Sequence, residues 1–150
     1  MPKIDVIDEA IIDSQPEIVF NALLDEFEGA KNWWMPHWEA KMKGNVPFRQ
    51  IGGTIGITVH RIGTPRWSAR SVEIVPSKFL KADFFEGAFL GNGEWSLEPV
   101  GDKTKVKFRF KVKTNKLLFT LVSPFVNIGK IHSDVMQKGF KALNSYLSKK

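Results

Sequence analysis

Strict alternation of apolar and charged residues marks the segment 103–113. Its sequence, Lys-Thr-Lys-Val-Lys-Phe-Arg-Phe-Lys-Val-Lys, places valine and phenylalanine on one face of an extended chain and the cations on the other. Such β-branched and aromatic residues suit a pleated, half-buried strand. Over 116–147 the apolar spacing becomes helical, which supplies a cover for the apolar face. The pattern predicts a sheet that packs against a long C-terminal helix.

The N-terminal third predicts one strand and two short helices. Residues 4–12 carry apolar side chains on both parities, so we expect a strand whose two faces are both partly covered. Ser14 and Glu17 have the spacing of a capping box, which predicts that a helix begins there. Gly29 ends that helix, and a second short helix is expected over 30–34.

Turn residues divide the middle of the chain into short extended segments. Glycine and proline pairs, with Gly91-Asn92-Gly93 as one of the turns, separate strands at 54–61, 67–75, 78–86 and 94–99. Short connections of this kind predict an antiparallel meander. Pro124 interrupts the last helical segment and predicts a kink or a restart after Ser123.

Composition narrows the class of protein. The 150 residues are 43% hydrophobic, within the range of one domain that spans 1–150. The absence of cysteine excludes disulfides and thiolate chemistry and fits a cytoplasmic location. The formal net charge of +6 favours attraction to anionic surfaces without choosing among lipid, nucleic acid and acidic ligands.

Three stretches carry a family resemblance. Residues 12–20 resemble the strand-to-helix entry of the SRPBCC superfamily, 86–99 its central hairpin, and 132–143 the terminal helix of its cyclase and dehydrase-like branch. The superfamily includes START domains, pollen-allergen-like proteins and polyketide cyclases. The resemblance implies an α+β helix-grip fold, in which a curved antiparallel sheet wraps a long C-terminal helix, with two short helices after the first strand. It also implies an apolar cavity that takes lipids, polyketides or aromatic compounds.

The many aromatic residues are candidates for the wall of that cavity. Trp33, Trp34 and Trp38 form the densest cluster, which is either a packing plug or a gate that faces the ligand. The other candidates are either core or cavity wall, and they are Phe84, Trp95, Phe108, Phe110, Phe125, Met136 and Phe140.

Polar candidates are few. His132 lies on the long helix near the expected cavity and is a candidate general base, because imidazole titrates near neutral pH; a surface or core histidine is the alternative. Arg61 and Glu86 would pair or orient a polar ligand group if strand parity turns them inward, and otherwise they are exposed strand ends. The three histidines have no metal-ligand spacing, so we expect no metal, and no phosphate or dinucleotide motif predicts a cofactor.

The sequence leads to one preferred function and two alternatives. We expect a hydrophobic small molecule to bind between sheet and helix; an enzyme of the polyketide cyclase or dehydratase kind and a protein-interaction or chaperone-regulating module are the alternatives. The cations of 103–113 allow transient contact with an anionic membrane surface. They argue against nucleic acid, since the stacking aromatics lie on the opposite face. The oligomeric state cannot be predicted.

Overall fold

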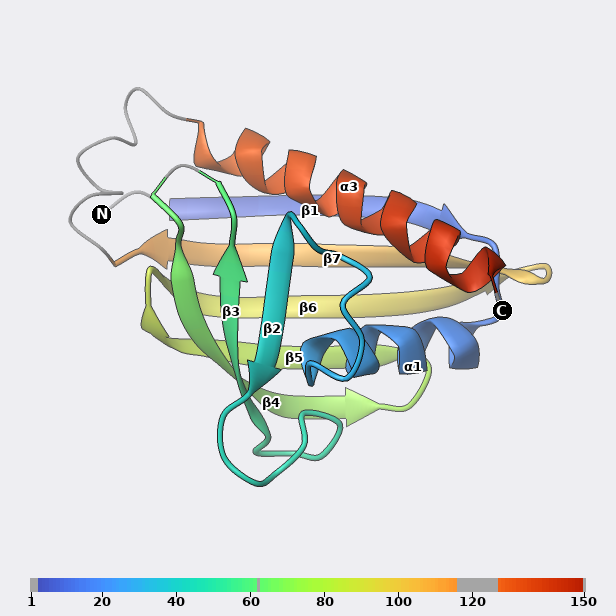
Figure 1. The fold of residues 1–150 in the computed structure, drawn as a ribbon, viewed down its shortest axis with the longest axis horizontal. Helices are drawn as coiled ribbons and strands as arrows, with labels where there is room; N and C mark the ends of the chain where they lie inside the picture. The colour runs from blue at the N-terminus through green and yellow to red at the C-terminus, as the bar shows by residue number, and fades with distance from the viewer. Residues whose placement is uncertain (1–2, 62, 116–126, 150) are drawn as a thin grey trace.

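A curled antiparallel sheet grips a long C-terminal helix in the computed structural model, which describes residues 3–61, 63–115 and 127–149 (Figure 1). Within these residues the sheet has seven strands in the order β1-β7-β6-β5-β4-β3-β2. The elements are β1 (Lys3–Ile12), α1 (Pro16–Phe27), β2 (Trp38–Met42), β3 (Thr54–Val59), β4 (Arg66–Val75), β5 (Phe79–Gly87), β6 (Phe89–Val100), β7 (Lys103–Thr114) and α3 (Ile128–Ser148). The α+β helix-grip fold is confirmed.

The alternating strand β7 lies where the charge pattern predicted. Val106, Phe108, Phe110 and Val112 are buried on the concave face, while the lysines between them face outward. β7 pairs with β1 on one side and with β6 on the other, so the N-terminal strand is an edge strand of the sheet, next to the last strand of the meander. The prediction that both faces of β1 are partly covered is wrong, because Ile7 and Ile11 are exposed on the outer face.

Glycines of β6 serve close packing and not a turn. The predicted turn at Gly91-Asn92-Gly93 lies inside β6, and the chain turns earlier, around Ala88. A Cβ on Gly91 would overlap the backbone carbonyl of Lys111, so this position requires glycine where β6 meets β7. The strand β2, which pairs with β3, was not predicted, because its first residue belongs to the tryptophan cluster.

The helix α1 begins and ends near the predicted residues, but its N-terminus is not capped as predicted. Its N-cap is Gln15 without a side-chain cap bond, so the predicted Ser14–Glu17 capping box is wrong. Pro16 suits the first helical position because its missing N–H would have no partner there. Gly29, with φ of 78°, follows the C-cap and ends the helix as predicted.

The second short helix over 30–34 is absent from the described chain, which forms turns there. The amides of Ala30 and Lys31 donate to the carbonyl of Asp25, and the amide of Trp34 donates to the Glu26 carboxylate. These bonds return the chain toward the end of α1. The turn directs the indoles of Trp33 and Trp34 toward the body of the protein, whereas adjacent residues of a helix point in different directions.

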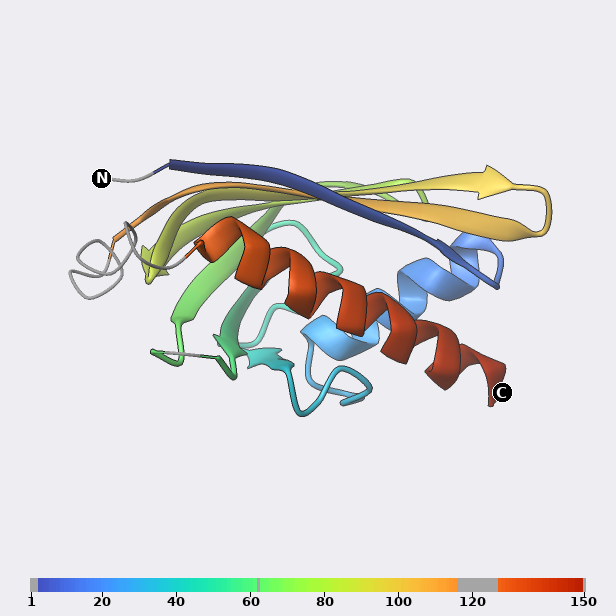
Figure 2. The ribbon, with the colours of Figure 1, turned by 90° about the horizontal axis from the view of Figure 1, so that it is seen from above.

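The helix α3 lies along the concave side of the sheet, and α1 is on the same side (Figure 2). Its buried stripe confirms the predicted helical spacing and consists of Val135, Met136, Gly139, Phe140, Leu143 and Leu147. Asn127 caps the helix by accepting a hydrogen bond from the amide of Lys130. The predicted start at 116 and the break at Ser123-Pro124 lie outside the described residues.

Gly139 is a close-packing position whose substitution tests this arrangement. A Cβ there would overlap the Trp34 indole, whose Nε1 donates to the Val135 carbonyl. We expect Gly139→Ala to lower the free energy of unfolding by about 2 kcal/mol, although alanine favours helix, because overpacking dominates. Urea denaturation measures the change. Lys141→Ala, exposed on the same helix, is the control, and equal stability of Gly139→Ala and wild type would contradict the packing.

Candidate functional site

An apolar cavity of about 180 Å³ lies between the concave face of the sheet and α3. Seven of the ten predicted ligand-binding residues lie on its wall: Trp34, Trp38, Phe84, Trp95, Phe108, Phe110 and Met136. Trp33 and Phe140 are not on the wall, and Phe125 lies outside the described residues. The placement is a structural fact, and the role of these residues in ligand binding stays a prediction.

Small residues on the central strands leave room for the cavity. Ala69 on β4 and Ala82 on β5 point inward among large rings. Gly93 on β6 lies against the rings of Phe108 and Phe84, and a Cβ there would be 2.8 Å from both. The alternation of strand residues aims these positions at α3, where the short side chains of Ala69 and Ala82 leave space unfilled and Gly93 makes room for the two phenylalanine rings.

The tryptophan cluster is a stack of three indoles that reaches the cavity. The ring centroids of Trp33 and Trp34 are 5.5 Å apart, and those of Trp34 and Trp38 are 4.4 Å apart. Trp33 is the half-buried outer member and stacks at 6.4 Å on Tyr146 of α3. Trp34 and Trp38 are buried and line the cavity, so the cluster closes this side of the site and forms part of its wall.

His132 projects from α3 onto the cavity wall and meets a buried carboxylate. Its ring stacks on Phe110 with centroids 3.9 Å apart, and its Nδ1 lies 3.5 Å from Oδ2 of Asp8 on β1. Burial lowers the pKa of His132 despite this neighbour, so the ring is neutral at neutral pH. Burial alone would raise the pKa of Asp8, but His132 and the Ser133 hydroxyl hold it below its usual value.

Sequence reasoning missed Asp8, although a signal was present. Asp8 shares the parity of Ile4, Val6 and Ile12, so it is a charged residue at a core-facing position of a strand. Buried carboxylates need partners, and here the Ser133 hydroxyl donates to Oδ2 of Asp8 at 3.1 Å. A charged residue at this core-facing position would have predicted a polar partner on the covering helix.

Arg61 lies at the rim of the cavity and bridges to α3. Its Nη2 is 3.1 Å from Nδ1 of His37 and 3.3 Å from Oδ2 of Asp134. Lys138 also donates to Asp134 at 3.3 Å. Burial, and then the charges of Arg61 and Lys138, lower the pKa of His37. The guanidinium therefore ties the end of β3 and the chain before β2 to the helix.

Glu86 does not join Arg61, and of the two alternatives for this residue the structure supports the exposed strand end. The carboxylate of Glu86 is exposed and accepts hydrogen bonds from Lys43 at 3.0 Å and from Ser68 at 2.9 Å. A register shift between Ser68 and Ala69 pairs Ser68 with Glu86 and Ala69 with Phe84. The irregularity changes the parity at the end of β5, which sequence alternation does not reveal.

Comparisons with known proteins identify the fold. The sequence matches no family model and no curated protein. Among solved structures, TTHA0849 from Thermus thermophilus is 20% identical with a TM-score of 0.74 over 95% of both chains, and a START superfamily protein from Mycobacterium smegmatis is 16% identical with a TM-score of 0.74 over 97% of both chains. The chain has the fold of the START superfamily.

A third solved structure with this START-type fold contains bound aromatic compounds. Norcoclaurine synthase from Thalictrum flavum, in complex with dopamine and hydroxybenzaldehyde, is 9% identical to this chain, with a TM-score of 0.67 over 99% of this chain and 88% of the other. At such identities the likeness defines the fold, while the residues of each site are particular to each chain.

Beneath the tryptophan stack of this START-type fold lies a second buried carboxyl group that sequence reasoning missed. Glu26 of α1 is 1% exposed, and its Oε1 accepts a hydrogen bond from the Trp34 amide at 3.2 Å. Oε2 has no partner among the described residues. Burial raises the pKa of Glu26 to about 7, against the opposing effect of the backbone amides. The signal was an acidic residue among the apolar Leu23, Leu24 and Phe27.

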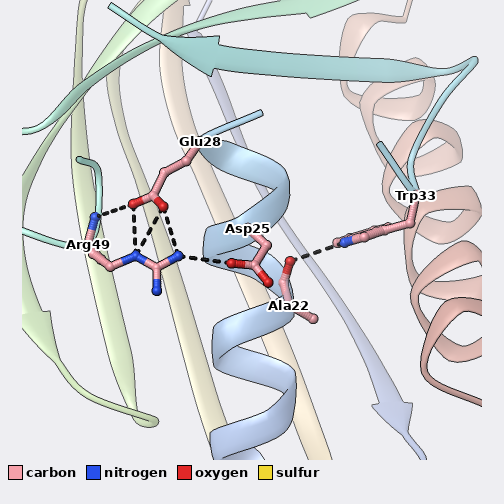
Figure 3. A network of polar contacts seen from close by, with 5 residues as sticks. All are labelled: Ala22, Asp25, Glu28, Trp33 and Arg49. Atoms are coloured by element: carbon pink, nitrogen blue, oxygen red, sulfur yellow. Dashed lines mark hydrogen bonds and ion pairs between the residues drawn. The ribbon is translucent and has the colours of Figure 1, made fainter. Parts of the chain in front are cut away.

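A network of polar contacts joins α1 to two neighbouring segments of the chain (Figure 3). Arg49, between β2 and β3, donates to Glu28 at 2.8 Å and to Asp25 at 3.0 Å, both at the end of α1. On the other side of α1 the Trp33 indole donates to the Ala22 carbonyl at 3.1 Å. These bonds hold the β2–β3 connection and the tryptophan turn on the same helix.

The outer face of β7 is basic, as predicted, but its neighbour β1 compensates part of the charge. Arg109 donates to Asp5 through two hydrogen bonds, and Lys105 and Lys107 lie within 4 Å of Glu9. Exposed ion pairs of this kind contribute little to stability.

The described residues offer neither a metal site nor a membrane-spanning helix. No group of three or more histidine, aspartate or glutamate side chains that could hold a metal ion occurs among the described residues. None of the described helices combines the length and the hydropathy needed to cross a membrane.

Proposed function

We propose that this protein binds an apolar aromatic small molecule in the cavity between the sheet and α3. The observation that carries the proposal is the space of about 180 Å³, whose wall is almost entirely aromatic and aliphatic. Apolar cavities in proteins stay dry and take apolar guests. The START-type fold supports the proposal, because another protein with this fold holds dopamine and hydroxybenzaldehyde.

The volume of the cavity favours a small aromatic guest over a long lipid chain. An engineered cavity of about 150 Å³ lined by similar residues takes benzene. The space here is slightly larger, which suits one substituted ring. Ten aromatic side chains around it also favour a flat ligand, since rings pack edge to face and in offset stacks.

The alternatives receive less support from the described site. Glu86, a candidate for proton transfer in a cyclase or dehydratase, does not line the cavity and faces solvent beside Lys43. A protein-interaction module based on the tryptophan cluster would need exposed indoles, whereas Trp34 and Trp38 are buried.

We place the binding protein in the cytoplasm, which the absence of cysteine fits. We also infer that the basic outer face meets anionic membranes only transiently.

Native mass spectrometry of the purified protein tests the proposal. We expect a one-to-one adduct with small aromatic compounds such as p-cresol, and organic extraction of the protein identifies any ligand carried through purification. Palmitate, which exceeds the cavity, is the matched probe and should give no adduct. No aromatic adduct, or equal adducts with palmitate, would contradict the proposal.

A further inference from the structure

The cavity contains one polar centre deep in its wall. Among the described residues that line the cavity, the ionisable side chains are His132 and Arg61. Arg61 already donates to His60, to Asp134 and toward His37 at the rim. His132 instead lies among aromatic rings, stacked on Phe110 and 5.7 Å from the ring centroid of Phe108. A ligand held against these rings therefore meets the imidazole.

The neighbour of His132 decides which of its nitrogens can accept a hydrogen bond. Nδ1 faces Oδ2 of Asp8 at 3.5 Å, and a carboxylate beside Nδ1 favours the tautomer with its proton on that nitrogen. Nε2 then carries a lone pair. We assign Nε2 as the acceptor that remains for a ligand, because Nδ1 is turned to Asp8.

Burial of the Asp8–His132 pair costs free energy of folding, which favours a functional role for the pair. Asp8 is 7% exposed, and its strand neighbours on the same face are apolar. Replacing a buried ionic group with apolar side chains often stabilises a protein, so such a group is weak evidence for a purely structural role. Ser133 adds a hydrogen bond that holds the carboxylate in place beside the imidazole.

A second unused polar atom lies on the same wall. The Nε1 of Trp67 is buried without a hydrogen-bond partner among the described residues. Phe110 lies between the two groups, with its ring centroid 6.2 Å from that of Trp67 and 3.9 Å from that of His132. The wall thus offers an acceptor at His132 and a donor at Trp67, and buried polar groups of this kind are expected to have partners.

We propose that the Asp8–His132 pair is the polar anchor of the cavity and selects an aromatic ligand with a phenolic or enolic hydroxyl, which donates a hydrogen bond to Nε2 of His132. The inference rests on the proposed function and adds the ligand class. Asp8 is a positioning residue, which fixes the tautomer, and Trp67 Nε1 takes an acceptor group where the ligand has one.

A pair of probes of equal shape tests the anchor. p-Cresol and p-xylene differ by a hydroxyl in place of a methyl group, and an apolar site without a partner for the hydroxyl prefers p-xylene. We expect wild type to bind p-cresol at least as tightly as p-xylene by titration calorimetry. His132→Phe keeps a stacked ring and removes the acceptor, so the ratio of the two affinities should move about tenfold toward p-xylene.

Asp8→Asn is the second variant, and it should move the affinity ratio in the same direction while the affinity for p-xylene stays the same. A measurement on wild type avoids any folding defect of the variants. The ¹⁵N resonance of His132 Nε2 should move upfield when p-cresol binds, because the nitrogen accepts a hydrogen bond, and should not move with p-xylene.

The outcomes separate this inference from the proposed function. Binding of both probes with a preference for p-xylene in wild type, and no response of Nε2, overturns the anchor and leaves the apolar site. An unchanged affinity ratio in folded His132→Phe also overturns it. Binding of neither probe overturns the proposed function and the anchor together.

Discussion

Ala69→Leu is expected to abolish the binding of aromatic probes. Ala69 is buried on β4 and lines the cavity, so the added carbons of leucine occupy the space that the ligand needs. The cavity accepts these carbons, and the free energy of unfolding should stay within about 1 kcal/mol of wild type. Calorimetric titration with p-cresol measures binding, and urea denaturation measures stability.

Ala22→Leu is the matched control for that result. Ala22 is equally buried, but it lies on α1 away from the cavity wall. Its leucine has no space to enter, so we expect a loss of stability of about 1–3 kcal/mol with the affinity retained. Ala69→Leu should lose binding and keep its stability, whereas Ala22→Leu should lose stability and keep binding. This contrast separates a filled cavity from a damaged fold. Binding by Ala69→Leu with the affinity of wild type would contradict the location of the site.

A pH-dependent loss of stability is expected from Glu26. Its pKa is about 7 in the folded protein against 4.5 ordinarily, so between these values the folded state holds a proton that the unfolded chain has released. Stability therefore falls as the pH rises through this window, by about 3 kcal/mol in all. Below pH 4.5 the full contribution is present, and above pH 7 the loss is complete.

Glu26→Gln isolates this effect from the other titrating groups. The amide keeps an oxygen that accepts from the Trp34 backbone but cannot ionise. We expect wild type to become less stable relative to Glu26→Gln, by about 3 kcal/mol between about pH 4.5 and pH 7.5, in urea denaturation curves. A difference between the two proteins that does not change with pH would contradict the burial of an ionisable Glu26.

The fold was predictable where a local pattern and the packing agree. The alternation along β7 and the helical spacing of α3 both follow from one buried face, and both are present in the structure. The turns were harder. Gly91 and Gly93 look like turn residues, yet they lie inside β6 because the backbone of β7 and the ring of Phe108 approach them closely.

The site was predictable in its aromatic part and not in its polar part. Strand parity aimed Phe84, Phe108 and Phe110 at the helix, and the structure places all three on the cavity wall. Parity failed at Glu86, since a register irregularity turns the end of β5 outward. The Asp8–His132 pair joins residues 124 positions apart, and only the docking of α3 on β1 brings them together.

The most direct test of the central claim is an isotope-filtered NMR experiment on the wild-type protein saturated with p-xylene. We predict nuclear Overhauser effects from the methyl groups of p-xylene to Trp95, Phe108 and Met136, which face the cavity from the sheet and the helix. Contacts restricted to exposed residues such as Ile7 and Ile11, or no intermolecular contacts at saturation, would contradict the binding of an aromatic molecule between the sheet and α3.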